Sequence, residues 1–349
     1  MSKYIAKGSQ KGRKPSKNKK GKKLKIALIV SMCLLLITAG SGFLMLYNLL
    51  DKISNVDERT QPDEIELEPE ENPENYPKGE DPDIDDIYKI PIREGSTKDM
   101  ENILLIGRDA RPGEINGRSD SMVILTIDKK EKTIKMTSIL RDLYVTFPDD
   151  EYLPARINHA HSWGGPIYLL DTITQNLRIR ISKYISVDFG GLENVIDTIG
   201  GVDINLTDAE AERIGVSAGM NHLNGAQALS FTRIRYIDSD FRRTGRQRQV
   251  LEEIFNKGKK KNPVEIVSLA NELLPLVTTN MSKMEIVGFA SNSNKYMKYP
   301  MAGEMMIPQE GTYEGQMIRD MALLVADMPT NVKDLHIHIF GNFIGPPAE

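Results

Sequence analysis

The longest apolar run of the chain covers residues 26–50 and contains no charged residue between Lys25 and Asp51. A helix of about 20 such residues is long enough to cross the hydrocarbon layer of a bilayer. A buried core helix seldom lacks a polar face over this length, and a cleaved signal peptide has a shorter apolar region that ends in small residues. The run therefore predicts a retained transmembrane helix.

Beyond this run, the spacing of apolar positions predicts strands and helices that interleave along the chain. Apolar and β-branched runs predict strands at residues 102–106, 122–128, 133–140, 202–206 and 228–234. Apolar residues at helical spacing predict helices at residues 167–177, 192–199, 243–257, 263–274 and 314–328. Such interleaving is typical of an α/β fold, in which a central mixed β-sheet is flanked by helices on both faces.

The charges are divided unevenly between the two sides of the apolar run. Residues 1–25 carry eleven Lys and Arg and no acid, whereas the rest of the chain carries 34 basic and 49 acidic residues. Because Lys and Arg stay on the cytoplasmic side during insertion, we expect a cytoplasmic N-terminus and an extracytoplasmic C-terminal domain. A basic tail can also bind nucleic acid, but its place beside a membrane span favours topology and anionic headgroups, so no nucleic-acid partner is expected.

Acidic residues and prolines dominate the segment that follows the apolar run. Residues 57–86 contain fourteen Asp or Glu, two basic residues and five prolines. This composition predicts an extended, self-repelling spacer. The chain is thereby divided into a basic cytoplasmic tail (1–25), a transmembrane helix (26–50), an acidic linker (51–98) and an extracytoplasmic domain (99–349). Its single cysteine, Cys33, excludes an intramolecular disulfide and a cysteine-based zinc site.

A first cluster of charged residues lies between the predicted strands 102–106 and 122–128, where sheets often place ligands. Mg²⁺ takes one or two carboxylates together with phosphate oxygens, and Arg side chains bind the remaining oxygens in pairs. The cluster is either a solvated loop or a magnesium-bridged phosphate site. It consists of the carboxylates Asp109 and Asp120 and the guanidiniums of Arg108, Arg111 and Arg118.

Two further clusters follow. In SILRD, Arg141 and Asp142 come directly after an apolar strand, and ARINHAH contains Arg156 with His159 and His161. The two histidines lack an evident third ligand, so a hydrogen-bonding role is favoured over a metal site.

The densest cluster, FTRIRYIDSDFRRTGRQRQVL, has six Arg and no Lys between residues 233 and 248. Arg is preferred over Lys where phosphate or carboxylate is bound in a planar, bidentate manner. On a strand, Arg233 and Arg235 would share one face. On the following helix, Arg243, Arg246 and Gln247 would share another. We expect both faces to converge on one anion.

Taken in order, these clusters resemble the LytR-CpsA-Psr family of bacterial cell-envelope proteins. The resemblance extends from about Asn102 to Leu251, and the family's basic tail, single membrane helix and extracytoplasmic domain match as well. Arg242 stands where the family usually has Gly, and Arg156 where it often has Lys. Residues 263–349 match poorly. The matching motifs are GRDAR, RSDSM, SILRD, RIN-HAH-WGG, YISVDFGGLENVIDTIGGVDINL, LNGAQALSFTRIR and DF-RT-RQRQ.

The resemblance implies a phosphotransferase of the cell membrane. Such an enzyme moves an anionic glycopolymer, such as teichoic acid or capsule, from a polyprenyl-pyrophosphate carrier to peptidoglycan and releases polyprenyl phosphate. By motif position, Asp109 and Asp120 would contact Mg²⁺, and either of them would accept the proton of the attacking hydroxyl. The pyrophosphate would be bound by Arg118, Arg141, Arg233 and Arg235, with Arg156 and Gln247 completing the shell and Arg243 and Arg246 as weaker assignments.

Two other activities are compatible with the same residues. A pyrophosphatase would use water as the nucleophile at this site. A non-catalytic protein would bind polyprenyl phosphates or regulate envelope functions. No serine, cysteine or histidine nucleophile is evident, so a covalent enzyme intermediate is not expected.

Overall fold

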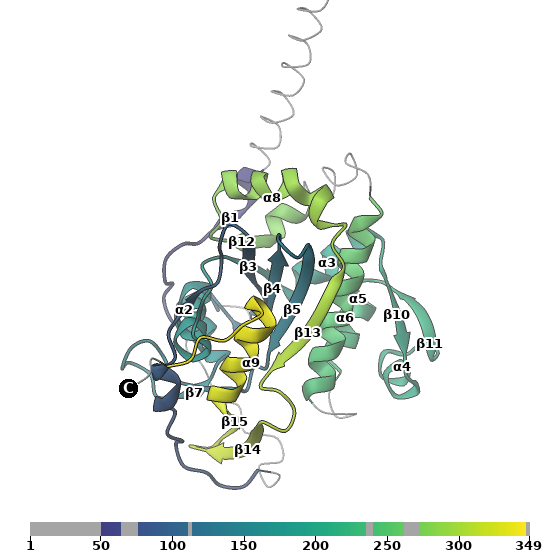
Figure 1. Cartoon of the computed structure of the whole chain (residues 1–349). Helices are drawn as coiled ribbons and strands as arrows, with labels where there is room; N and C mark the ends of the chain where they lie inside the picture. Colours follow the sequence, from purple (N-terminus) through teal and green to yellow (C-terminus); the bar gives the residue numbers. More distant parts are fainter. Residues whose placement is uncertain (1–49, 64–75, 111–113, 235–239, 262–271, 347–349) are drawn as a thin grey trace, which may run out of the picture. The chain divides into compact units, whose positions relative to one another are not determined.

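A computed structural model of the chain describes residues 50–63, 76–110, 114–234, 240–261 and 272–346 (Figure 1). The predicted cytoplasmic tail and residues 26–49 of the predicted transmembrane helix lie outside these ranges. Within them, no helix combines the length and apolarity that a bilayer crossing requires.

The described residues are built around a seven-stranded mixed sheet with the order β1-β12-β9-β3-β4-β5-β13. In its centre, β3 runs parallel to β9 and antiparallel to β4, which in turn is antiparallel to β5. The strand predictions at 102–106, 122–128 and 133–140 are confirmed as the neighbouring strands β3, β4 and β5. The strands are β1 (Ser54–Asn55), β3 (Met100–Asp109), β4 (Arg118–Asp128), β5 (Thr133–Ile139), β9 (Tyr184–Asp188), β12 (Val277–Thr279) and β13 (Met301–Ile307).

Helices cover both faces of this sheet (Figure 1). On one face, α2 (His159–Leu177) and α9 (Met328–Phe340) pack on Leu104, Ile124 and Ile139. Because alternate residues of a strand point to opposite faces, Ile127 and Ile134 lie on the other side. There they contact Phe255 of α6 (Asp240–Lys259) and Phe289 of α8 (Lys283–Tyr296). The predicted α/β class with helices on both faces is confirmed.

A second apolar cluster lies beside the sheet and includes Ile196, Phe231 and Val250. It joins α3 (Phe189–Ile199), α5 (Gly225–Thr232) and α6 to the hairpin of β10 (Val202–Leu206) and β11 (Gly219–Leu223). The remaining elements are η1 (Leu50–Lys52), η3 (Asp85–Lys89), β2 (Arg93–Glu94), β6 (Tyr144–Val145), β7 (Ala155–Arg156), β8 (Ile179–Arg180), α4 (Asp208–Ile214), η4 (Leu274–Leu276), β14 (Tyr313–Ile318) and β15 (Met321–Ala326).

The strand prediction at residues 228–234 is wrong, because residues 225–232 form the helix α5. Asn224 caps its first turn: its side chain accepts the amide of Gln227, whose own side chain accepts the amide of Asn224. This capping box supplies partners for two backbone donors that the start of a helix otherwise leaves unpaired. Ala228 and Phe231 are then three residues apart on the buried face.

The helix prediction at residues 314–328 is also wrong. Residues 313–326 form the hairpin of β14 and β15, and α9 begins only at Met328. The turn residues Arg319 and Asp320 both have positive φ angles, of 49° and 60°. Two consecutive left-handed residues match the twist of a tight hairpin, which overrides the helical spacing of the apolar positions.

The described parts of the predicted spacer, residues 51–63 and 76–98, differ from the extended conformation expected for them. β1 joins the main sheet, β2 pairs with β8, and Ile87 and Ile90 are buried. Ile84, Ile87 and Ile90 recur at three-residue spacing and present an apolar side among the acids. The folded domain therefore starts near residue 50. Of the helix predicted at 263–274, residues 263–271 lie outside the described ranges.

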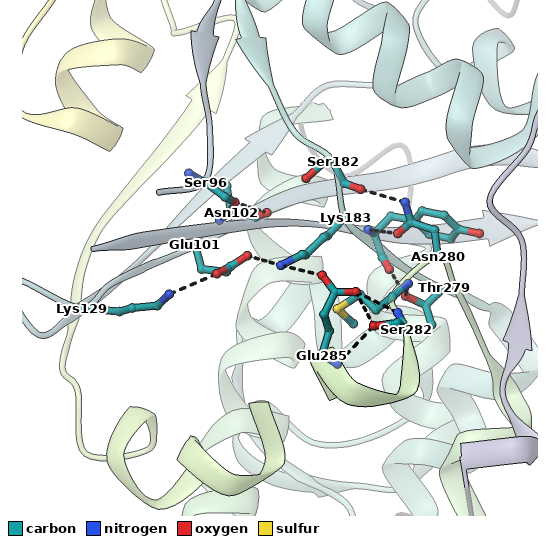
Figure 2. A network of polar contacts seen from close by, with 12 residues as sticks. Ser96, Glu101, Asn102, Lys129, Ser182, Lys183, Thr279, Asn280, Ser282 and Glu285 are labelled. Atoms are coloured by element: carbon teal, nitrogen blue, oxygen red, sulfur yellow. Dashed lines mark hydrogen bonds and ion pairs between the residues drawn. The ribbon is translucent and has the colours of Figure 1, made fainter. Parts of the chain in front are cut away.

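A network of charged residues around the buried Glu101 connects the strands at the end of the sheet where β3 and β9 begin (Figure 2). Glu101 of β3 bridges Lys129 at 3.2 Å and Lys183 at 2.7 Å, and Lys183 also contacts Glu285 of α8 at 3.2 Å. Burial alone would lower the pKa of Lys183, but its hydrogen bonds to the two carboxylates raise the pKa above its ordinary value. The network thus ties the central sheet to α8.

We predict that Glu101→Ala lowers the free energy of unfolding by about 2–3 kcal/mol, because it leaves two ammonium groups without their shared carboxylate. Glu94→Ala is the matched control, because the Glu94–Arg180 pair is largely exposed and should change stability by about 0.5 kcal/mol or less. Denaturant unfolding of both variants checks this. Equal losses in the two would contradict the role assigned to the network.

Candidate active site

The candidate site lies where β3 and β9 end and β4 begins. Asp109 is opposite Arg118 in the β3–β4 register, and Arg108 is opposite both Ser119 and, on the other side, Asp188 of β9. The register shifts by one residue between Gly107 and Arg108, which makes Asp120 the extra residue of a bulge in β4. Bulges redirect side chains and are frequent beside active sites.

Alternating charges form a chain on one side of this site. Arg141 lies between two carboxylates, with Nη1 3.4 Å from Asp120 Oδ1 and Nε 3.3 Å from Asp142 Oδ2. Arg156 contacts the other oxygen of Asp142 at 3.4 Å and donates from Nε and Nη2 to the Ala322 carbonyl at 3.1 Å. The Arg141 side chain is only 19% exposed, so its direction is set by the protein before any ligand binds.

The second part of the site joins the ends of β3 and β9 to α3 and α5. Arg233, the C-cap residue of α5, lies 3.9 Å from Asp109 Oδ2, and its guanidinium stacks over the Phe189 ring at 4.7 Å. Arg108 contacts Asp188 at 3.6 Å. Asp188 is also the N-cap of α3 and accepts the Gly191 amide at 2.7 Å. The positive end of the α3 dipole therefore faces the same region as the two guanidiniums.

Asp142 and Asp188 are functional neighbours that the analysis of the sequence did not assign to the site. Each accepts contacts from guanidiniums of the site and so holds them in place. Asp188 had a recognisable signal, because it stands between an apolar strand and a helix start, where Asp is a preferred cap. For Asp142, the only signal in the sequence was its place beside Arg141.

The carboxylates of the site have the donor chemistry that Mg²⁺ prefers. Asp109 and Asp120 come from neighbouring strands at the same end of the sheet, and their side chains are 32% and 16% exposed. Within the residues that the structure describes, no group of three or more His, Cys, Asp or Glu is placed to hold a metal. Two carboxylates nevertheless suit an ion that takes its other ligands from substrate phosphates.

The Arg-rich segment is arranged differently from the expectation. Arg233 ends the helix α5, so the prediction that Arg233 and Arg235 share one face of a strand is wrong for Arg233. Arg235 and Arg111 lie outside the described residues. Arg246 is buried in α6 and contacts Glu210 at 3.4 Å and the Ile234 carbonyl at 2.9 Å. These contacts tie α6 to α4 and to the end of α5.

Arg243 and Gln247 share α6 with Arg246, Arg243 being buried and Gln247 partly buried. Their predicted contacts with the anion remain predictions, as do those of the other arginines.

The two histidines of the third cluster are neutral and buried at the start of α2. Burial lowers the pKa of His159 to about 3 and that of His161 to about 4. Neutral His161 lies with Nδ1 2.9 Å from the Gly117 carbonyl, so Nδ1 carries the proton and donates it. The hydrogen-bonding role expected for this cluster is confirmed for His161.

The chain belongs to the LytR_cpsA_psr family, whose sequence profile matches residues 54–330. The polyisoprenyl-teichoic acid–peptidoglycan teichoic acid transferase TagU of Bacillus cereus is 36% identical over 189 residues, which cover 50% of this chain and 61% of the relative. The TagU of Bacillus mycoides is 32% identical over 243 residues, 65% of this chain and 78% of the relative. This chain therefore aligns with less than two thirds of the B. cereus protein.

Solved structures of similar proteins have the same fold. The crystal structure of B. subtilis TagV has a TM-score of 0.58 and 30% identity, and the match covers 70% of this chain and 98% of that one. TagT bound to LI-WTA has a TM-score of 0.57 and 26% identity, covering 69% and 91%.

We predict that acidification destabilises the domain through His161. Between pH 6.5 and about 4 the unfolded chain binds a proton that the folded protein excludes, so stability is complete above pH 6.5 and falls as the pH falls to about 4. The loss attributable to His161 is about 3 kcal/mol.

In His161→Asn the amide can replace the Nδ1–H donor without titrating, so its stability should change less with pH over this range. The control replaces an exposed side chain that does not titrate, Met220→Gln, and should follow the parent. Urea unfolding at a series of pH values measures the difference. Parallel pH profiles for His161→Asn and the parent would refute the assignment.

Proposed function

We propose that this chain is a phosphotransferase that moves an anionic glycopolymer of the teichoic acid or capsule type from a polyprenyl-pyrophosphate carrier to peptidoglycan. The observation that carries the proposal is the set of oriented arginines beside two partly exposed carboxylates at the ends of β3 and β4. Its family membership and the transferase names of its relatives support it.

We further propose that the chain is a single-pass protein of the cell membrane, with its N-terminus in the cytoplasm and its catalytic domain outside. The support is the uncharged run at residues 26–50 and the eleven basic residues that precede it. This location gives the domain access to a lipid-linked donor and to peptidoglycan.

The arginines of the site are proposed to bind the pyrophosphate. Arg141 is the central one, because two carboxylates hold it in place while its side chain is still 19% exposed. Arg118 comes from β4 and Arg233 from the end of α5, and Arg156 supports Arg141 through their shared partner Asp142. Phosphate oxygens would replace carboxylate oxygens around these groups, since guanidiniums bind both in the same bidentate geometry.

Asp109 and Asp120 are the residues that would hold Mg²⁺ in this proposal. The ion, when bound, would offset negative charge on the pyrophosphate. The hydrogen bond of Arg141 to Asp120 and the ion pair of Arg233 with Asp109 would then weaken, which would free both guanidiniums for the substrate.

The proposed reaction is a direct displacement at phosphorus. A peptidoglycan sugar hydroxyl attacks the phosphorus next to the polymer and forms a new P–O bond. The bond from that phosphorus to the bridging oxygen breaks, and polyprenyl phosphate leaves with the electron pair. The hydroxyl proton passes to Asp109 or Asp120, and the arginines stabilise the charge that develops on the leaving phosphate.

We predict that Arg141→Ala lowers kcat/KM for transfer by about 100-fold to 1,000-fold, the loss expected when an oriented charge stabiliser is removed. The assay uses the full chain in lipid nanodiscs with a polyprenyl-pyrophosphate oligosaccharide, peptidoglycan and Mg²⁺. Arg180→Ala is the matched control, because Arg180 is exposed and pairs with Glu94 alone among the contacts described for it.

Polymer covalently attached to peptidoglycan, with an unchanged Arg180 variant, is the expected result. Polymer released into solution at the same rate would identify a hydrolase, and full activity of Arg141→Ala would remove the arginine site from the mechanism.

A further inference from the structure

Residues 56–63 form a segment, here called the strap, that runs from β1 across the start of α2 to the loop before β4. Arg59 pairs with Asp149 at 2.9 Å and Asp171 at 3.1 Å, and it lies over the Tyr168 ring at 4.4 Å. The Thr60 amide donates to the Gly164 carbonyl at 3.3 Å. The strap, which belongs to the sequence predicted to be a spacer, is therefore fastened to the domain along its length.

The strap ends in a carboxylate that is bound by three consecutive backbone amides. Asp63 Oδ1 accepts the amide of Ile115 at 2.7 Å, and Oδ2 accepts the amides of Asn116 at 3.0 Å and Gly117 at 2.8 Å. Successive amides that point to one spot form a concave site for an anion. Charge-assisted hydrogen bonds of this kind are stronger than neutral ones, so Asp63 fixes the path of residues 115–117.

Residues 115–117 are also hydrogen-bonded to the start of α2. The Gly117 carbonyl accepts hydrogen bonds from His161 Nδ1 at 2.9 Å and from Ser162 Oγ at 3.0 Å. Buried Asn116 accepts the Thr60 hydroxyl at 2.6 Å and donates to the carbonyls of Gln61 and Ser162. The N–H and the C=O of Gly117, the residue before Arg118, are thus both hydrogen-bonded within the protein.

Gly117 connects these hydrogen bonds to the candidate active site. Its φ is +70°, and a Cβ atom there would lie 2.4 Å from the Asp109 carbonyl oxygen, so the loop passes directly against the end of β3. The next residue is Arg118, which lies opposite Asp109 in the sheet register. A shift of Gly117 would therefore move both a proposed pyrophosphate ligand and a proposed Mg²⁺ ligand.

We propose that Asp63 is a positioning residue for the transfer reaction: by binding the amides of residues 115–117, it sets the direction from which Arg118 meets the pyrophosphate. This inference rests on the proposed function. It assigns to the acidic segment a role that its composition does not indicate, because Asp63 acts through a fixed loop rather than through its charge alone.

A double-mutant cycle in the nanodisc transfer assay tests the proposal. We expect Asp63→Asn to raise KM for the polyprenyl-pyrophosphate donor about tenfold while kcat falls less than about threefold, because Asn presents an N–H group to one of the amides. Hydrogen exchange at the amides of residues 115–117 should accelerate about tenfold or more. In the Arg118→Ala background, Asp63→Asn should have no further effect on KM, since coupled residues are not additive.

Two further variants keep the test decisive. Glu58→Gln removes an exposed carboxylate from the same strap and should leave KM unchanged. Thr60→Val removes the hydroxyl bonded to Asn116 and should raise KM about twofold to threefold, which tests the strap even if Asp63→Asn fails to fold.

Additive effects of Asp63→Asn and Arg118→Ala, or an unchanged KM in Asp63→Asn, would overturn the positioning role and leave the proposed function standing. An unchanged KM in Arg118→Ala would overturn the positioning role and the assignment of Arg118 to the pyrophosphate, because Asp63 acts on the donor through Arg118. Absence of polymer transfer by the parent chain would overturn the proposed function.

Discussion

The arrangement of the site depends on the alternation of carboxylates and guanidiniums across the ends of adjacent strands. Arg141 is held between Asp120 and Asp142, and Arg156 takes the second oxygen of Asp142. Without the carboxylates, partly buried arginines would repel one another and turn toward water. With them, several guanidiniums remain oriented in the absence of a ligand, so a pyrophosphate that binds as proposed would meet donors whose ordering is already complete.

The fold supplies the fixed points that this alternation requires. Antiparallel β3 and β4 place Asp109 beside Arg118, and the bulge adds Asp120 at the same end of the sheet. Helices on both faces immobilise these strands, and the capped start of α3 brings a helix dipole to the region of Arg108 and Arg233. The proposed site therefore lies at the sheet end, where side chains from several elements meet.

Sequence patterns predicted the central sheet because its strands are long apolar runs bounded by polar turns. They also identified Arg141 and the two candidate metal carboxylates, which follow or precede such runs. The patterns failed where tertiary structure decided the outcome. Residues 228–234 have a β-like pattern, but the cap at Asn224 favours the helix α5 there. Residues 314–328 have a helical pattern, but the left-handed turn at Arg319 and Asp320 favours a hairpin.

Asp63 could not be recognised for a different reason. It is one of fourteen acids in residues 57–86, and its three amide partners come from a loop more than 50 positions away in the sequence. Only the folded structure distinguishes Asp63 from the other acidic residues of this segment. The same holds for Asp142, whose two arginine partners are brought together by the β6–β7 pairing.

A crystal structure of the protein with a polyprenyl pyrophosphate and Mg²⁺ bound would test the proposed phosphate site most directly. We expect phosphate oxygens against Arg118, Arg141 and Arg233, with the metal ion held by Asp109 and Asp120. A pyrophosphate bound elsewhere, with the Arg141 contacts to Asp120 and Asp142 unchanged, would contradict the central claim that these alternating charges form the phosphate site.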